Sequence, residues 1–215
     1  MKESLQKNNT VDFYGRDFII SPDVLIPRPE TEMIVDTVLD LAGKAYLPGV
    51  KPKAPVLPNN CKILDVGTGS GCIAITLKLE LPEAQIAASD ISEPALKVAR
   101  ENATRLGAEV EFIKSDLLEE ILGDFDVIVA NLPYVDKDWD WIDKEALAKE
   151  PSIALYADSH GLALIYQLIE QAAKRGVPRL ILEADPCQHQ DIIKYARQND
   201  YQLKSTHGFV LYLSE

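Results

Sequence analysis

Hydrophobic and polar positions follow two rhythms along the chain, one typical of buried strands and one typical of amphipathic helices. Short apolar runs stand between longer segments whose apolar residues recur every three or four positions. The short runs predict strands at 62–66, 85–90, 110–113, 125–130, 179–183 and 209–213. The longer segments predict helices at 71–81, 93–106, 161–174 and 187–199. Strands that alternate with helices predict an α/β fold with a doubly wound, mainly parallel sheet.

The region before residue 61 has shorter elements. Residues 13–20 predict a short hairpin or extended segment with Gly15 in its turn, because glycine permits the backbone conformations of tight turns. Residues 31–41 carry apolar residues at helical spacing, and Thr31 stands where a helix cap is expected. We therefore predict a hairpin followed by one helix.

A proline-rich stretch follows at 47–60. It contains four prolines and one glycine, which excludes a helix interior or a central strand. We interpret it as an exposed connector between two units. An N-terminal segment at 1–60 is expected to pack on a main domain at 61–215, which is long enough for one sizeable core.

Composition narrows the classes of protein to which the chain can belong. No apolar run approaches the roughly 20 residues of a membrane-spanning helix, and residues 1–7 are polar, so we expect neither a membrane protein nor a secretory signal. The cysteines lack paired spacing, which is typical of a reducing cytoplasm. The histidines stand apart from them, so no metal site is expected. These residues are Cys61, Cys72, Cys187, His160, His189 and His207.

The net charge of −12 bears on possible partners. Affinity for phosphate comes mainly from lysine and arginine, and a basic footprint is the usual sign of a nucleic-acid binder. We therefore expect no broad binding to nucleic acid. The net charge does not exclude a local basic patch, because it says nothing about where the charges lie.

A glycine-rich loop follows the first strand of the main domain. Its three glycines allow a ligand to approach the backbone closely, next to the start of a helix. The following strand ends in Asp90, whose carboxylate can accept hydrogen bonds from both hydroxyls of a ribose. The pattern predicts a nucleoside-containing cofactor, although nicotinamide enzymes share much of it. The predicted cofactor-binding residues of the loop are Gly67, Thr68, Gly69, Ser70 and Gly71.

The tetrapeptide Asn131-Leu132-Pro133-Tyr134 follows the strand at 125–130. The Asn131 side-chain oxygen and the Leu132 carbonyl can each accept a hydrogen bond from a substrate NH2 group. Pro133 stiffens the turn, and the Tyr134 ring can lie flat against an amide or a base. Two acceptors aimed at one nitrogen would direct its lone pair at an activated methyl group, which is catalysis by positioning.

The candidate groups all occupy equivalent places in the predicted sheet. The glycine loop, Asp90, Asp116 and Asn131 each follow a strand. In doubly wound sheets, ligands bind beyond the carboxyl ends of the strands, at the point where the strand order reverses. We therefore expect these four positions to face one crevice.

Several segments resemble the protein-glutamine N5-methyltransferases that modify peptide chain release factors. The resemblance covers about residues 11–200 and implies a Rossmann-like class I S-adenosylmethionine-dependent methyltransferase of the cytoplasm, with an antiparallel strand at the C-terminal end of its sheet. The substrate implied is the glutamine of the Gly-Gly-Gln loop in a class I release factor. The matching segments are FYGRDF at 13–18, LIPRPETE at 25–32, ILDVGTGSGCIA at 63–74, NLPY at 131–134 and EPSIAL at 150–155.

The resemblance also implies roles for individual residues. Residues 67–71 and Asp90 would bind S-adenosylmethionine, and Leu117 would occupy an adenine-side position that is often aromatic in the family. Asn131 would touch both ligands, the tetrapeptide would hold the glutamine side chain, and Asn131 and Tyr134 would be catalytic. The family's usual tetrapeptide is Asn-Pro-Pro-Tyr, and Leu132 keeps the backbone carbonyl needed at the second position.

Docking of the substrate is a separate question. Family members usually carry an N-terminal helical domain that helps to bind the release factor, and only about ten residues precede the matching segment here. A partner that replaces this domain is one expectation. The segment at 25–32 favours the glutamine enzymes specifically.

Other functions stay open from the sequence. Related tetrapeptides hold adenine for methylation of an exocyclic amine, although the acidic charge opposes this alternative. Two further alternatives are methylation of a different protein glutamine and a non-catalytic module that binds the cofactor. Arg28 and Glu30 are interpreted either as groups that fix the N-terminal segment over the cofactor or meet substrate, or as a solvated structural ion pair. Trp139 and Trp141 are interpreted either as a substrate rim or as rings packed on the body.

Overall fold

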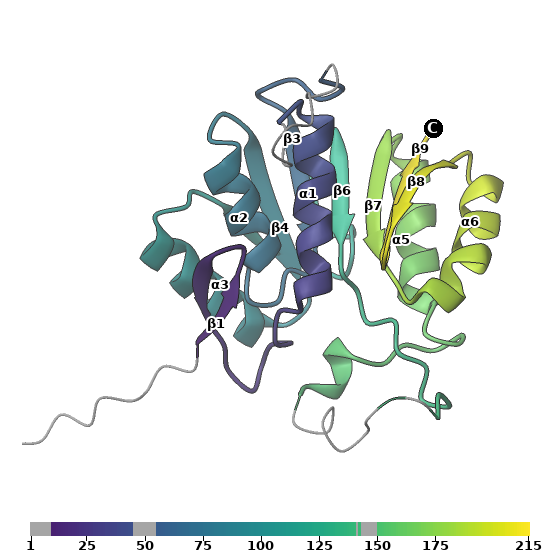
Figure 1. Ribbon diagram of the computed structural model, residues 1–215, viewed down its shortest axis with the longest axis horizontal. Coiled ribbons are helices and arrows are strands. Elements are labelled where there is room, and N and C mark those ends of the chain that lie inside the picture. Colours follow the sequence, from purple (N-terminus) through teal and green to yellow (C-terminus); the bar gives the residue numbers. More distant parts are fainter. Residues whose placement is uncertain (1–9, 45–54, 141, 143–149) are drawn as a thin grey trace, which may run out of the picture.

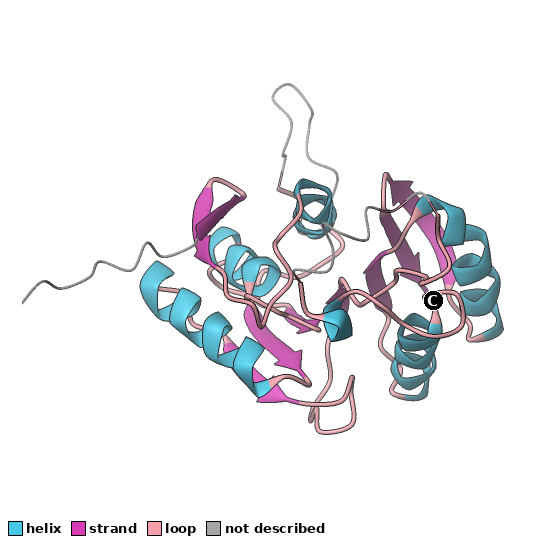
Figure 2. Cartoon of the chain, turned by 90° about the horizontal axis from the view of Figure 1, so that it is seen from below, coloured by secondary structure: helices cyan, strands magenta, loops and turns pink. Residues whose placement is uncertain are grey.

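The computed structural model describes residues 10–44, 55–140, 142 and 150–215. Their centre is a seven-stranded sheet with helices on both faces (Figures 1 and 2). Five neighbouring strands are parallel, and the order reverses between the first and fourth of them along the chain. In sheet order the strands are β5 (Glu111–Lys114), β4 (Gln85–Asp90), β3 (Lys62–Val66), β6 (Val127–Ala130), β7 (Arg179–Glu183), β9 (Val210–Ser214) and β8 (Gln202–His207).

The parallel strands are buried on both faces, and their side chains alternate between two cores. On β6, Val127 and Val129 enter one core, whereas Ile128 and Ala130 enter the other. The helices α1 (Glu32–Leu41), α2 (Cys72–Glu80) and α3 (Glu93–Leu106) cover the first face. The helices α5 (Ala163–Lys174) and α6 (His189–Gln198) cover the second.

The N-terminal elements pack on the first face. The strands β1 (Thr10–Phe13) and β2 (Arg16–Ile19) form an antiparallel hairpin, and their buried rings Phe13 and Phe18 meet edge to face. The hairpin contacts α3, and α1 packs against α2, β7 and β9 (Figure 1). Burial of the Phe13 and Phe18 rings joins the hairpin to the core that α1 and α2 share.

The sequence predicts most of this architecture. The α/β class, the parallel sheet and the antiparallel strand at its end are confirmed. The strand β8 was not predicted, because it lies at the edge of the sheet and Leu203 is its one large apolar residue. It pairs antiparallel with β9.

The role predicted for Thr31 as a helix cap is wrong. Thr31 has helical backbone angles, φ −66° and ψ −23°, and its side chain makes no capping hydrogen bond. A 3-10 helix at Pro29–Thr31 leads directly into α1, so the chain turns before Thr31 is reached. The Thr31 hydroxyl is thereby available to a group elsewhere in the fold.

The predicted proline-rich connector falls partly outside the described residues, which omit 45–54. The described part is not wholly exposed. Leu57 is buried in the core next to α1, and its N–H donates to the Leu41 carbonyl at 3.0 Å. This contact satisfies an acceptor at the end of α1.

Two further properties concern the described parts of the chain. None of the helices there combines the length and the hydrophobicity needed to cross a bilayer. Within the same ranges, no three His, Cys, Asp or Glu side chains gather in a way that could hold a metal ion.

Candidate active site

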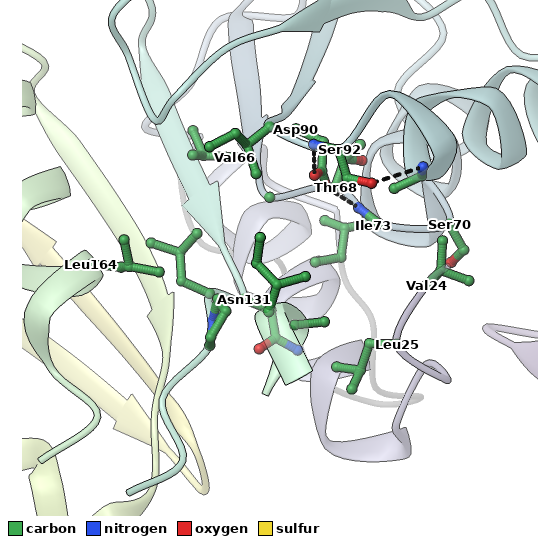
Figure 3. Close-up of a pocket in the computed structure, with 18 of the residues that line it drawn as sticks. Val24, Leu25, Val66, Thr68, Ser70, Ile73, Asp90, Ser92, Asn131 and Leu164 are labelled. Atoms are coloured by element: carbon green, nitrogen blue, oxygen red, sulfur yellow. Dashed lines mark hydrogen bonds between the residues drawn. The ribbon is translucent and has the colours of Figure 1, made fainter. Parts of the chain in front are cut away.

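A cavity of about 290 Å³ opens at the carboxyl ends of β3, β4 and β6, where the strand order reverses (Figure 3). The glycine loop, Asp90, Asp116 and Asn131 all line it, so the structure brings the four predicted positions together. The N-terminal segment closes another side of the cavity, with Val24, Leu25, Pro27 and Thr31. Of the predicted site residues, Gly71 and Tyr134 are not in the lining.

The glycine loop is held against the end of β4. The N–H groups of Gly67 and Thr68 donate to the Ser89 carbonyl at 2.8 and 2.9 Å. Gly71 caps α2 with φ +82°, and a Cβ there would lie 2.8 Å from Ile75 Cδ1 and 3.1 Å from Ala99 Cβ. Gly71 is therefore required for packing of α2 against α3.

Asp90 fixes the same loop from the side of the cavity. Its Oδ2 accepts the Gly69 N–H at 2.9 Å, and its Oδ1 accepts the Ser92 N–H at 2.9 Å (Figure 3). Burial raises the pKa of Asp90, while these backbone donors act in the opposite direction. Each carboxylate oxygen has further lone pairs, so both can accept hydrogen bonds from a ligand in the cavity.

Asp65 supports the loop from below. It is fully buried, and its Oδ2 accepts the Thr68 hydroxyl at 2.6 Å and the Ala74 N–H at 3.2 Å. Burial raises the pKa of Asp65 to about 7. Its Oδ1 has no hydrogen-bond partner among the described residues. Asp65 thus ties the loop to the first turn of α2 and does not itself face the cavity.

The segment after β5 forms another wall. Leu117 is buried with φ +49°, and its carbonyl accepts the Ser115 hydroxyl at 2.9 Å. Ser115, Asp116 and Leu117 all line the cavity. The position implied for an adenine contact therefore lies on the same cavity as Asp90.

The tetrapeptide is anchored from several directions. Asn131 Nδ2 donates to Thr31 Oγ1 at 3.0 Å. Leu132 is buried against Gly67, with Cδ2 2.9 Å from the place of a Gly67 Cβ. The Tyr134 hydroxyl donates to Glu183 Oε1 at 3.1 Å, and burial raises the pKa of Tyr134. The Tyr134 ring is therefore held by its hydroxyl at the end of β7.

Glu150 holds the N-terminal segment through two contacts. Glu150 pairs with Arg28 and also accepts the Ile26 N–H at 3.1 Å. Of the interpretations left open by the sequence, Arg28 thus lies in an ion pair, though with Glu150 instead of Glu30. Trp139 donates its backbone N–H to the Asp136 carbonyl at 3.2 Å, and Trp141 lies outside the described residues.

Sequence reasoning missed two groups beside Asn131, namely Thr31 and Glu183. Glu183 ends β7, is 1% exposed, and has a pKa that burial raises to about 7. A carboxylate at the end of a buried strand is the same signal that identified Asp90. Applied to the strand predicted at 179–183, it would have found Glu183.

Comparisons with known proteins indicate the family of the chain. A model of the methyltransferase small domain family matches residues 34–148. A release factor glutamine methyltransferase of Koribacter versatilis is 44% identical over 163 residues, which are 74% of this chain and 54% of that protein. One of Bacteroides thetaiotaomicron is 36% identical over 92% of this chain and 71% of its own length. The chain thus spans about half the length of several curated relatives that it matches.

Solved structures share the fold at low sequence identity. A ribosomal protein L11 methylase of Lactobacillus delbrueckii superposes with a TM-score of 0.59 and 22% identity, covering 89% of this chain and 81% of that one. The 16S rRNA N2 G1207 methyltransferase of Thermus thermophilus, in complex with AdoMet and guanosine, gives 0.65 and 14% identity, with 96% and 49% covered. Because the family model spans more than half of the chain and a relative is matched over most of its length, this chain belongs to the methyltransferase small domain family and, within it, to the release factor glutamine methyltransferases.

Proposed function

We propose that this protein transfers a methyl group from S-adenosylmethionine to the side-chain nitrogen of a protein glutamine, namely that of the Gly-Gly-Gln loop of a class I peptide chain release factor. One observation carries the proposal. The Asn131 amide nitrogen is held by Thr31 at 3.0 Å, so its oxygen is the end left to accept an N–H from a substrate. Relatives that carry this activity by name support the choice of substrate.

The cavity fits the cofactor. A Cβ on Gly69 would meet no atom within 4 Å, so the apex of the loop leaves room for a ligand against its backbone. Asp90 supplies carboxylate oxygens for the ribose hydroxyls, and Leu117 supplies an apolar wall for a base. The proposed cofactor contacts are Gly67, Thr68, Gly69, Ser70, Gly71, Asp90, Leu117 and Asn131, with Gly71 acting through the start of α2.

When bound, S-adenosylmethionine supplies a methyl group on a sulfonium, which is already activated for transfer. The protein therefore has to hold the acceptor nitrogen in line and exclude water. The Asn131 oxygen and the Leu132 carbonyl accept the two N–H groups of the glutamine amide. Holding both hydrogens in this way keeps the nitrogen lone pair directed at the cofactor side of the cavity.

The rest of the tetrapeptide keeps these acceptors in place. Pro133 lines the cavity and fixes the backbone after Leu132. Tyr134 is held by Glu183 outside the cavity lining, and we propose that its ring lies against the substrate amide as the amide enters. Asn131 and Tyr134 are the proposed catalytic residues, and Leu132 and Pro133 complete the proposed substrate site.

Methyl transfer to defined substrates tests the proposal. The purified protein would be incubated with methyl-labelled S-adenosylmethionine and a class I release factor, beside the same factor with alanine in place of the Gly-Gly-Gln glutamine. Label is expected only on the first. Label on both factors would point to another residue, and label on an adenine-containing oligonucleotide alone would favour methylation of a base amine.

A further inference from the structure

A buried polar cluster lies directly behind Asn131. It consists of Thr31, Tyr134 and Glu183, and we call it the Glu183 cluster. Thr31 precedes α1, Tyr134 follows β6, and Glu183 ends β7, so three distant parts of the chain meet there. Thr31 is 2% exposed and Glu183 1%. Groups buried so deeply need internal hydrogen-bond partners.

In both hydrogen bonds of the cluster, a side chain of the tetrapeptide is the donor. Tyr134 Oη donates to Glu183 Oε1 at 3.1 Å, and Asn131 Nδ2 donates to Thr31 Oγ1 at 3.0 Å. Glu183 Oε2 is buried and has no hydrogen-bond partner among the described residues, so it is an acceptor without a donor. Thr31 and Asn131 act on Glu183 as donors that lower its pKa, against the larger effect of burial.

The orientation of Asn131 is the chemical problem that this cluster solves. An asparagine amide has an acceptor end and a donor end of nearly the same shape, so packing alone does not decide which end faces the cavity. The Asn131 oxygen and the Leu132 carbonyl would both accept hydrogen bonds from a glutamine NH2. An Asn131 NH2 turned into the cavity would instead place one donor against another. The neighbours of Asn131 must therefore select one orientation.

The single hydroxyl proton of Thr31 makes that selection. If the Thr31 hydroxyl donates its hydrogen bond to a carboxylate, the Thr31 oxygen remains an acceptor and accepts a hydrogen bond from the Asn131 NH2. If the Thr31 hydroxyl instead donates to Asn131, the amide oxygen of Asn131 turns toward Thr31 and the NH2 turns to the cavity. An ionised carboxylate only accepts hydrogen bonds, so Glu183 imposes the first arrangement when it is ionised, above a pH of about 7.

We infer that Thr31 and Glu183 are positioning residues, in which Glu183 accepts a hydrogen bond from the Thr31 hydroxyl and thereby holds the Asn131 oxygen toward the substrate. The inference rests on the proposed function and adds to it a reason for a buried carboxylate beside an uncharged substrate site. The carboxylate of Glu30 raises the pKa of Glu183 by charge repulsion. Tyr134 and Thr31 oppose that effect as donors.

Isosteric variants separate this role from simple packing. Glu183→Gln keeps the shape but brings an NH2 that can donate to Thr31. The Thr31 hydroxyl can then donate its own hydrogen bond to the Asn131 oxygen. Thr31→Val removes the hydroxyl, and Thr31→Ser keeps it. Thr37→Val is the matched control, because the buried Thr37 hydroxyl on α1 donates to the Met33 carbonyl of its own helix, at 2.7 Å.

Kinetics with a Gly-Gly-Gln release factor give the first measurement. We expect kcat to fall about 10- to 100-fold in Glu183→Gln and in Thr31→Val, because a misaligned acceptor loses positioning in the transition state. The dissociation constant for S-adenosylmethionine should stay within about twofold, and Thr31→Ser and Thr37→Val should keep most of kcat. A fall of the same size in Thr31→Ser, or unchanged kcat in Glu183→Gln, would overturn the inference.

The Asn131 side-chain NH2 resonances give a second measurement that needs no activity. They are assigned in a nitrogen–proton correlation spectrum by their absence from Asn131→Ala. Their exchange with water should be about tenfold faster in Glu183→Gln and Thr31→Val than in the wild type or Thr37→Val. If the wild type failed to methylate glutamine, the proposed function would be wrong. The comparison of exchange rates would still decide which end of the Asn131 amide faces the cavity. Equal exchange in all four proteins would overturn the inference.

Discussion

The carbonyl oxygen of Tyr134 lies 2.0 Å from the point at which a Cβ on Gly161 would stand. Gly161 also has φ +82°, a conformation that residues with a side chain rarely adopt. Gln188 Nε2 donates to the same Tyr134 carbonyl at 2.8 Å. The backbone after the tetrapeptide is therefore seated against the turn before α5, with no space between them for a methyl group.

Gly161→Ala should lower the free energy of unfolding by about 2–4 kcal/mol, since it adds backbone strain to a clash with main-chain atoms. Gly176→Ala is the control, because Gly176 has φ +65° but open space around the Cβ position. The control should cost about 1–2 kcal/mol, from the strain alone. Urea unfolding of both variants measures the difference, and equal losses would show that the contact with Tyr134 yields freely.

Asp90 should determine affinity for the cofactor. In Asp90→Ala the ligand loses its carboxylate acceptors and Gly69 loses the partner of its N–H, so S-adenosylmethionine should bind about 10- to 100-fold more weakly. Asp90→Asn keeps one acceptor and should fall between. Titration calorimetry gives the constants, with Glu101→Gln on the exposed face of α3 as control. Binding within about twofold in Asp90→Ala would remove Asp90 from the cofactor site.

The ion pair between Arg28 and Glu150 should contribute measurably to stability. Glu150 has a side chain that is 7% exposed, whereas Arg28 is 38% exposed, so solvent screens the pair in part. A double-mutant cycle with alanine at both positions should give a coupling of about 1 kcal/mol. The exposed pair of Arg100 and Glu93 is the control, with an expected coupling below about 0.5 kcal/mol. Equal coupling in the two cycles would contradict a clamping role for Glu150.

Stability should depend on pH through Asp65. Burial raises the pKa of Asp65 in the folded chain to about 7 from its ordinary value of 3.8, so between these pH values the folded chain keeps a proton that the unfolded chain loses. The contribution of Asp65 is therefore largest at low pH and is lost as pH rises through about 7. Asp65→Asn keeps an oxygen for Thr68 and Ala74 and removes the titration.

The measurement is the free energy of unfolding at pH 5.5 and pH 8 for Asp65→Asn, the wild type and Asp124→Asn, an exposed control. The loss on going to pH 8 should be about 1–2 kcal/mol smaller in Asp65→Asn than in the other two proteins. Parallel pH profiles in all three would show that Asp65 does not titrate in this range.

Buried parallel strands and capped helices could be read directly from the sequence. The strands at 62–66, 85–90 and 179–183 and the helix at 93–106 have the predicted bounds. Their apolar runs are continuous because both faces of the sheet are covered. The crevice followed from topology, since strand ends of a parallel sheet meet at one edge.

Contacts between distant segments could not be read in the same way. Thr31 looked like a local cap, but its hydroxyl meets Asn131, which is 100 positions further along the chain. Local pattern carries no information about such a pair. The edge strand β8 has little apolar pattern, because one row of its side chains faces solvent and its burial follows from pairing with β9.

The identity of the methylated atom tests the central claim most directly. A class I release factor would be treated with S-adenosylmethionine and the wild-type protein or Asn131→Ala, and the peptide with the Gly-Gly-Gln loop would be sequenced by tandem mass spectrometry. The account predicts one added methyl group on the glutamine side chain with the wild type and almost none with Asn131→Ala. A methyl group on any other residue, or equal methylation by both proteins, would contradict it.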